Sequence, residues 1–134
     1  MCVPTNQSFA PGIQKTRFVI AVPNLAVSAA FYRDALGFEI VELAPGWLVY
    51  RSGLCVIMAG ECPDAIPPTQ LGDHSYFAYL EIDDLESYYA SVSASGATVC
   101  KLLCTEPWGM KEFGVITADG HRIMFAQQEA GERS

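Results

Sequence analysis

The sequence has few basic residues and few side chains of the kind that bind metals. It holds 8 lysines and arginines against 15 aspartates and glutamates, for a net charge of −7, and only two histidines. Binding to a phosphate backbone needs clustered lysine and arginine, so this balance argues against a nucleic-acid-binding protein. A negative field favours a cationic or neutral small ligand, although it also provides plain solubility.

No two cysteines have the CxxC spacing of a zinc or redox motif. The five cysteines are an odd number, and Cys100 and Cys104 in a strand would lie roughly 13 Å apart, too far for a disulfide or a shared zinc ion. We therefore expect free thiols, with Cys55 in the core. The chain shows no signal-peptide pattern and no run near the ~18 apolar residues of a membrane span, so we expect a soluble, cytoplasmic protein.

The length of 134 residues fits a single domain. We expect an N-terminal arm over residues 1–15 and a C-terminal tail over residues 128–134, because neither stretch shows a regular apolar pattern. The domain between them has a proline-rich linker near its middle. The predicted bounds are 16–127 for the domain, about 16–60 for module one, 60–74 for the linker and about 75–127 for module two.

The apolar pattern of each module predicts one strand, one helix and three further strands. Asn24 is the expected N-cap of the first helix, and Asp83 with Glu86 has capping-box spacing at the second. Asp119-Gly120 predicts a type I′ turn in the closing hairpin. Strands are predicted at residues 17–22, 38–43, 47–51, 54–59, 76–82, 97–103, 115–117 and 123–125, and the helices are expected to end at Gly37 and near Gly96.

The two modules repeat the same pattern almost in step. Residues 22–25 correspond to residues 82–85 at an offset of 60, and Gly37 corresponds to Gly96 at an offset of 59. We therefore predict an α+β fold of two βαβββ modules. They would form a mixed-sheet half-barrel with the helices on its outer face and a concave cleft where a ligand binds.

Two segments resemble the vicinal oxygen chelate superfamily, which includes glyoxalase I, extradiol dioxygenases and bleomycin-resistance proteins. One is the Val-Pro-Asn-Leu of residues 22–25 followed by the Phe-Tyr-Arg-Asp-Ala-Leu-Gly-Phe of residues 31–38. The other is the Pro-Trp-Gly-Met-Lys-Glu-Phe of residues 107–113 with the Asp-Gly-His of residues 119–121. The resemblance implies the fold predicted above and a homodimer, but it leaves open whether a member is an enzyme or a binding protein.

The same resemblance implies a test for a metal site. Metal-dependent members carry histidine, glutamine or glutamate ligands on four strands, and the corresponding positions here are Arg17, Met58, Phe77 and Met124. None of these is a suitable ligand for a hard divalent metal. We expect no bound metal or cofactor. His74 in the linker and His121 after the turn are better explained as solvent-facing or structural residues.

Strand alternation predicts which side chains face the cleft. If Phe18, Ile20, Val22, Ala78, Leu80, Ile82, Ile123 and Phe125 pack on the helices, their neighbours face the opposite side. The predicted cleft is aromatic, contains methionine and has a few charges, which suits a planar, partly apolar ligand. Its predicted ligand-binding residues are Arg17, Trp47, Tyr50, Met58, Phe77, Tyr79, Glu81, Trp108, Glu112, Arg122 and Met124.

Three functions fit this pattern. The first is a metal-free, non-catalytic protein of the bleomycin-resistance type that sequesters an aromatic or cationic, antibiotic-like molecule. The second is a glyoxalase-like lyase or dioxygenase with displaced metal ligands. The third is a metal-independent enzyme with Glu81 or Glu112 as general base. We expect the first, and therefore a protein that is not an enzyme. The side chains could instead fill the cleft with no ligand, and Arg17 and Arg122 could serve only in ion pairs.

Overall fold

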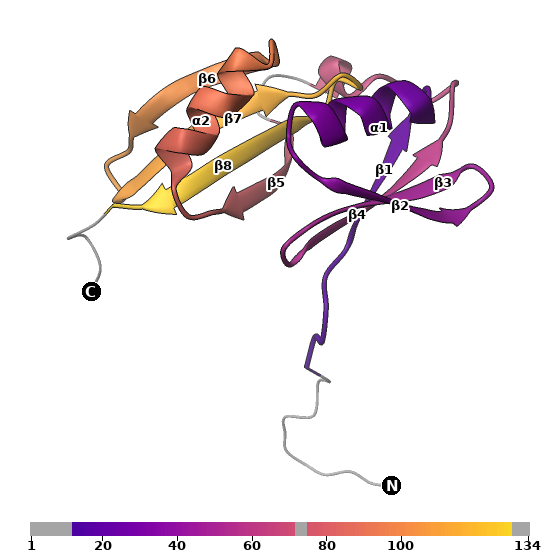
Figure 1. The fold of residues 1–134 in the computed structure, drawn as a ribbon, viewed down its shortest axis with the longest axis horizontal. Coiled ribbons are helices and arrows are strands. Elements are labelled where there is room, and N and C mark those ends of the chain that lie inside the picture. The colour runs from indigo at the N-terminus through magenta and orange to yellow at the C-terminus, as the bar shows by residue number, and fades with distance from the viewer. Residues whose placement is uncertain (1–11, 72–74, 130–134) are drawn as a thin grey trace, which may run out of the picture.

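The computed structural model describes residues 12–71 and 75–129, and the two predicted modules follow one another along the chain (Figure 1). The predicted arm up to residue 11, His74 and the end of the tail lie outside the described residues. Module one contains β1 (Phe18–Val22), α1 (Leu25–Asp34), β2 (Glu39–Ala44), β3 (Trp47–Ser52) and β4 (Cys55–Glu61). After a 3-10 turn (Pro68–Leu71), module two contains β5 (Tyr76–Glu81), α2 (Leu85–Ala94), β6 (Thr98–Thr105), β7 (Met110–Ile116) and β8 (Arg122–Gln128).

Each module forms its own four-stranded mixed sheet. Module one forms sheet A, in the order β1-β4-β3-β2, and module two forms sheet B, in the order β5-β8-β7-β6. In both sheets the first strand pairs in parallel with the last, and the other pairs are antiparallel. Both helices lie on the same side of the sheets, which do not close into a barrel (Figure 1). The predicted α+β fold of two βαβββ modules is confirmed.

Local signals set the helix ends in part as predicted. The Asn24 side chain accepts a hydrogen bond from the backbone N–H of Val27 at 3.0 Å, so it is the N-cap of α1. The prediction of a capping box at α2 is wrong. The N-cap is Asp84, in the left-handed conformation and without a side-chain capping bond. The backbone N–H of Leu85 is satisfied instead by the Gln127 side chain on β8, at 3.0 Å.

The core lies between each sheet and its helix. Where the strands are regular, alternate residues turn towards the helices, and the expected inward faces of β1 and β8 are confirmed. We call the opposite side of each sheet its open face, because neither helix covers it. Fully buried side chains of the core include Val22, Tyr32, Tyr50, Ile57, Leu85, Val92, Phe113, Val115 and Ile123.

The closing hairpin differs from its prediction in two ways. Its strands are longer, since β7 begins at Met110, and its turn is not type I′. A type I′ turn needs positive φ at both central residues, but only Gly120, at φ 94°, has one in this segment. Asp119 keeps an ordinary φ, and its side chain points into the protein towards α1.

Side chains, rather than a shared strand pair, join the two modules. The rings of Phe18 on β1 and Phe77 on β5 meet edge to face, with centroids 5.6 Å apart. The Tyr88 hydroxyl of α2 donates a hydrogen bond to the Leu36 carbonyl at 2.6 Å. No helix among the described residues is long and apolar enough to cross a membrane.

Candidate functional site

The open face of sheet B brings together polar side chains from three of its four strands, β5, β6 and β7. By register, Tyr79 on β5 lies beside Met124 on β8, and Met124 lies beside Gly114 on β7. Gly114 in turn pairs with Lys101 on β6. Two residues before Gly114, Glu112 points to the same side of β7. The open face of sheet B therefore carries the phenol of Tyr79, the carboxylate of Glu112 and the ammonium group of Lys101.

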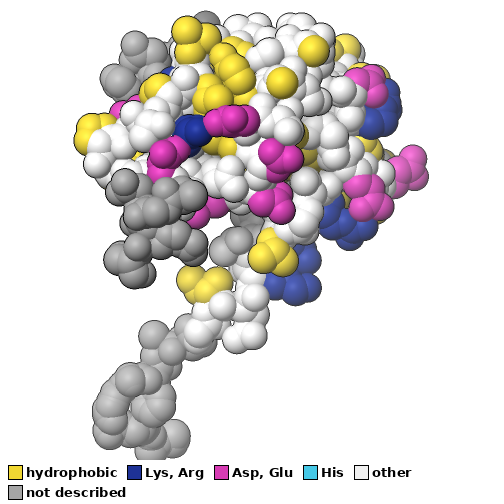
Figure 2. Space-filling model, turned by 60° about the vertical axis from the view of Figure 1, so that its left-hand side comes forward, with side chains coloured by type: hydrophobic (Ala, Val, Ile, Leu, Met, Phe, Trp, Pro, Cys, Tyr) yellow, Lys and Arg dark blue, Asp and Glu magenta, His cyan; other side chains and the backbone are white. Residues whose placement is uncertain are grey.

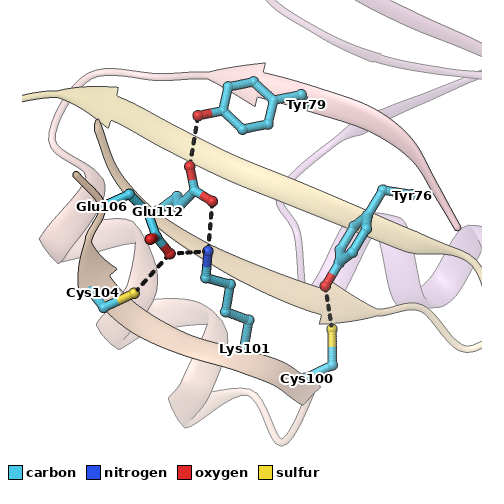
Figure 3. Close-up of polar contacts among 7 residues, drawn as sticks. All are labelled: Tyr76, Tyr79, Cys100, Lys101, Cys104, Glu106 and Glu112. Carbon is cyan, nitrogen blue, oxygen red and sulfur yellow. Dashed lines mark hydrogen bonds and ion pairs between the residues drawn. The ribbon is translucent and has the colours of Figure 1, made fainter. Parts of the chain in front are cut away.

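Glu112 is the centre of this group. It is only 2 % exposed, yet it lies on the face that no helix covers. One carboxylate oxygen accepts a hydrogen bond from the Tyr79 hydroxyl at 2.7 Å, and the other accepts one from the Lys101 ammonium at 2.6 Å (Figure 3). A buried carboxylate is expensive unless it is paired, and these two donors provide the pairing.

Lys101 connects Glu112 to a second carboxylate. Its ammonium lies 2.5 Å from Glu106, which also accepts a hydrogen bond from the Cys104 thiol at 3.4 Å (Figure 3). Burial by itself would lower the pKa of Lys101, but the hydrogen bonds to Glu106 and Glu112 outweigh it and raise the pKa. Lys101 is therefore a fixed cation held between two carboxylates.

Two tyrosines on this face remain protonated. Burial, and then the hydrogen bond to Glu112, raise the pKa of Tyr79 to about 12. Burial, and then the contact with Cys100, raise the pKa of Tyr76 to about 12. The Tyr76 hydroxyl lies 3.4 Å from the Cys100 sulfur (Figure 3). Both phenols are thus hydrogen-bonding groups at neutral pH and not bases.

Aromatic rings and a carboxylate surround the site at its edge. Trp108, in the β6–β7 connection, is 64 % exposed, and Tyr79 is 46 % exposed. Trp108 and Glu81 both act on the pKa of the Tyr79 hydroxyl, which Trp108 lowers and the charge of Glu81 raises. Arg122 and Met124 lie further along the same open face. The structure thus brings together six of the predicted site residues: Tyr79, Glu81, Trp108, Glu112, Arg122 and Met124.

A groove of about 790 Å³ adjoins this site at the boundary between the modules. Tyr79 and Glu81 line it together with aromatic side chains that include Phe18 and Tyr88. Its lining contains two carboxylates, Glu81 and Asp83, and no lysine, arginine or histidine from the described residues. The groove extends the site with a surface that is apolar and acidic.

The other predicted site residues lie elsewhere. Arg17, Trp47 and Met58 are on or beside the open face of sheet A. Tyr50 was expected in the cleft, and this is wrong. It is fully buried on the helix side, where its hydroxyl donates a hydrogen bond to Ser28 at 2.7 Å. Trp47 and Tyr50 are three residues apart in one strand, so they must point to opposite faces.

Phe77 was also expected on the open face, and a bulge accounts for its different position. Between Tyr76 and Ala78, β5 has one residue more than its partner β8. The extra residue, Phe77, packs at the module boundary against Phe18 and His121. Tyr76 takes the place on the open face that alternation assigned to Phe77.

Sequence reasoning missed five members of this site: Tyr76, Cys100, Lys101, Cys104 and Glu106. Alternation along the predicted strand at residues 97–103 could have placed Lys101 beside Glu112, had the pairing of that strand with β7 been known. The pairing is irregular, with register shifts between Val99 and Lys101 and between Lys101 and Cys104. Counting alternate residues along the strand therefore could not identify Lys101 as the charged partner of Glu112.

The donor atoms of the site do not fit a catalytic divalent metal. Three of the positions that the resemblance assigns to metal ligands hold Arg17, Met58 and Met124, and at the fourth Tyr76 takes the place on the open face that was expected for Phe77. The nearby carboxylate of Glu112 already binds Tyr79 and Lys101 through both oxygens. Within residues 12–71 and 75–129, no three histidine, cysteine or acidic side chains are grouped to hold a metal ion.

Comparison with known proteins agrees with the topology. The sequence pattern of the Glyoxalase/Bleomycin resistance protein/Dioxygenase superfamily matches residues 15–125. A search of curated proteins found no match.

Solved structures with low sequence identity share the fold. A glyoxalase/bleomycin resistance protein/dioxygenase from Nocardioides has a TM-score of 0.70 at 13% identity, with 92% of this chain and 88% of that chain covered. One from Alicyclobacillus acidocaldarius has a TM-score of 0.72 at 12% identity, with 86% and 91% covered. TioX from Micromonospora sp. ML1 has a TM-score of 0.68 at 16% identity, with 84% and 98% covered.

Proposed function

The chain belongs to the Glyoxalase/Bleomycin resistance protein/Dioxygenase superfamily, and we propose that it is a metal-free member that binds a small, planar, cationic molecule. The ligand occupies the open face of sheet B and the adjoining groove. One observation carries the proposal: Glu112, a buried carboxylate, lies on the face that no helix covers, beside the exposed rings of Tyr79 and Trp108. Sequestration of an antibiotic-like molecule is the role that this arrangement supports best.

The charge of the site favours a cation. Four carboxylates, those of Glu81, Asp83, Glu106 and Glu112, outnumber the two cations of the site and its groove, Lys101 and Arg122. On the face of the molecule that Figure 2 draws, acidic side chains are spread over the surface and basic ones lie beside some of them. An ammonium group on a flat ring would stack on Trp108 and Tyr79 while its charge faces these carboxylates.

The arrangement gives less support to catalysis. A general base must be free to accept a proton from its substrate, whereas both oxygens of Glu112 already accept hydrogen bonds. Glu81 is exposed to solvent, and among the described residues it has no hydrogen-bonded partner that would orient it. Neither carboxylate is therefore set up to remove a proton.

We also propose that the protein forms a homodimer. A large apolar side chain, Val19, is 65 % exposed on β1, at one edge of the open face of sheet A. A second copy placed over this edge would remove it from water. Sedimentation equilibrium should give twice the chain mass of 14.6 kDa, and Val19→Glu should shift it towards a single chain. A wild-type chain that sediments at its own mass up to 1 mM would exclude the dimer.

The ligand class can be tested with three probes that share one ring. The probes are 1-naphthylmethylammonium, neutral 1-naphthalenemethanol and anionic 1-naphthoate, and isothermal titration calorimetry measures their affinities. The ammonium should bind more tightly than the alcohol, and Trp108→Ala should weaken it roughly tenfold. Trp47→Ala is the matched control, because Trp47 lies on the other sheet. Equal binding of ammonium and alcohol, or no effect of Trp108→Ala, would refute the proposal.

A further inference from the structure

The open face of sheet A has the opposite charge from that of sheet B. A hollow of about 600 Å³ on this face is lined by Lys15, Arg17 and Arg51, with Glu42 as the only acidic residue of its described lining. These are three of the eight basic residues in a chain whose net charge is −7. A local excess of two positive charges, three basic minus one acidic, is thus concentrated in one hollow of an acidic protein.

The strand register explains why the hollow has an apolar floor. Val41 pairs with Val49, and Val49 pairs with Met58, so these three form a row across the middle of the sheet. The next row places Arg51 opposite Val56. All of them point away from α1, because the intervening residues of each strand pack into the core.

The segment before β1 supplies the other two charges. Arg17 comes one residue before β1, and Lys15 two residues earlier, where the chain leaves sheet A on the side away from α1 (Figure 1). Neither forms an ion pair with any acidic side chain of the described residues. Arg51 is held at 3.2 Å by Glu39, which is itself largely exposed. Lys15 and Arg17 are therefore available to a ligand. Arg51 has a fixed position and keeps its Nη1 group for a ligand, because Glu39 accepts from its Nε and Nη2.

We propose that this hollow is a second binding site, specific for an organic anion that carries a carboxylate or phosphate on an apolar body. The apolar part rests on Val49, Val56 and Met58, and the anionic group is held by Arg17 and Arg51 at the rim. A guanidinium binds a carboxylate or phosphate with two parallel hydrogen bonds, which gives both energy and orientation. This hollow meets the groove beside sheet B at Thr16, Gly53 and Leu54, and its ligand has the opposite charge from the one proposed for sheet B.

The test uses 1-naphthoate as the probe and 1-naphthalenemethanol as its neutral counterpart. At 20 mM salt the naphthoate should bind more tightly than the alcohol, and both Arg17→Gln and Arg51→Gln should weaken it about tenfold. The matched control is Arg33→Gln, because Arg33 lies on α1 and pairs with Asp34. Raising the salt to 500 mM should remove most of the preference for the anion.

Location and folding are checked in the same samples. Amide shifts in two-dimensional NMR should concentrate on Val49, Val56 and Met58 with naphthoate, and unchanged melting temperatures would show that both variants fold. The inference is overturned if naphthoate binds no more tightly than the alcohol, or if Arg17→Gln and Arg51→Gln bind it like the wild type. The binding of 1-naphthylmethylammonium is measured on the same variants, so that a failure of this inference is distinguished from a failure of the proposed cation site near Trp108.

Discussion

Asp119 in the β7–β8 turn accepts a hydrogen bond of 2.7 Å from the Ser28 hydroxyl of α1, so the last hairpin of module two is bonded to the first helix of module one. Ser28 in turn accepts a hydrogen bond of 2.7 Å from Tyr50 on β3. All three side chains are buried. Because this chain of hydrogen bonds crosses the module boundary, it fixes how the two modules sit against each other.

The buried Asp119 makes stability depend on pH. Burial raises its pKa, and the hydrogen bond from Ser28 opposes the rise only in part. Because the folded-state pKa is above the unfolded value, the protonated form favours folding, and this contribution is lost as the pH rises through the folded-state pKa. Asp119→Asn should therefore gain stability relative to the wild type between pH 4 and pH 7. Urea unfolding across this range measures the gain, with exposed Asp64→Asn as the control. A constant difference at all pH values would contradict it.

Removing the Ser28 hydroxyl should lower the free energy of unfolding more than removing the Tyr50 hydroxyl does. Tyr50→Phe deletes a single hydrogen bond and should lower the free energy of unfolding by about 1 kcal/mol. Ser28→Ala leaves both the Tyr50 hydroxyl and the Asp119 carboxylate buried without this partner, which should cost about 1–3 kcal/mol. Chemical denaturation of the two single variants and the double variant gives the coupling energy. Additive losses would show that the two bonds act independently.

Lys101 should be important for stability as well as for the site. Lys101→Met would leave the buried Glu112 without its cation, and we expect a loss of about 2 kcal/mol, below the value for a fully buried pair because Lys101 is 25% exposed. The matched control is Lys111→Met, whose partners Glu86 and Glu129 are 67% and 28% exposed and whose loss should be much smaller. Equal losses in thermal or urea unfolding would mean that Glu112 does not depend on Lys101.

The Trp47 ring packs directly against Gly60 on β4, where a larger residue would leave it no room. A Cβ added at Gly60 would lie 2.7 Å from Cη2 of the Trp47 ring, so Gly60→Ala must displace the indole. In a Trp108→Phe background Trp47 is the only tryptophan, and its emission should shift and its quenching by acrylamide should increase. Gly12→Ala is the control, since its added Cβ meets only the Gln14 side chain at 4.0 Å. Unchanged emission would place the ring elsewhere.

Local signals predicted the repeated strand and helix order because each module has clear turns and alternating strands. The same reasoning failed where a residue's direction depends on a partner strand. Phe77 was placed on the open face by counting in twos, but the extra residue in β5 cannot be seen without β8. The first half of β7 was missed because Met110 and Lys111 show no alternation, and its pairing with β6 and β8 is what makes it a strand.

The site shows the same division. Glu112, Tyr79 and Trp108 could be named from the sequence, because a carboxylate and aromatic rings near a predicted cleft are visible as residue types. The ion pair between Glu112 and Lys101 could not be predicted, because it joins β6 and β7, two strands whose register is irregular. Tyr50 was an avoidable error, since its spacing from Trp47 already assigned them to opposite faces.

The separate hydrogen-bond ladders of the two sheets affect how copies of this chain can assemble. Among the described strands, none of sheet A pairs with one of sheet B. Two chains could therefore exchange modules while every ladder stays intact, and the side-chain contacts between the modules, such as those at Ser28, Phe18 and Leu36, would form again with the other copy. The barrier to such an exchange is set by a few buried contacts and by the reach of the connection between β4 and β5, not by the unfolding of either sheet.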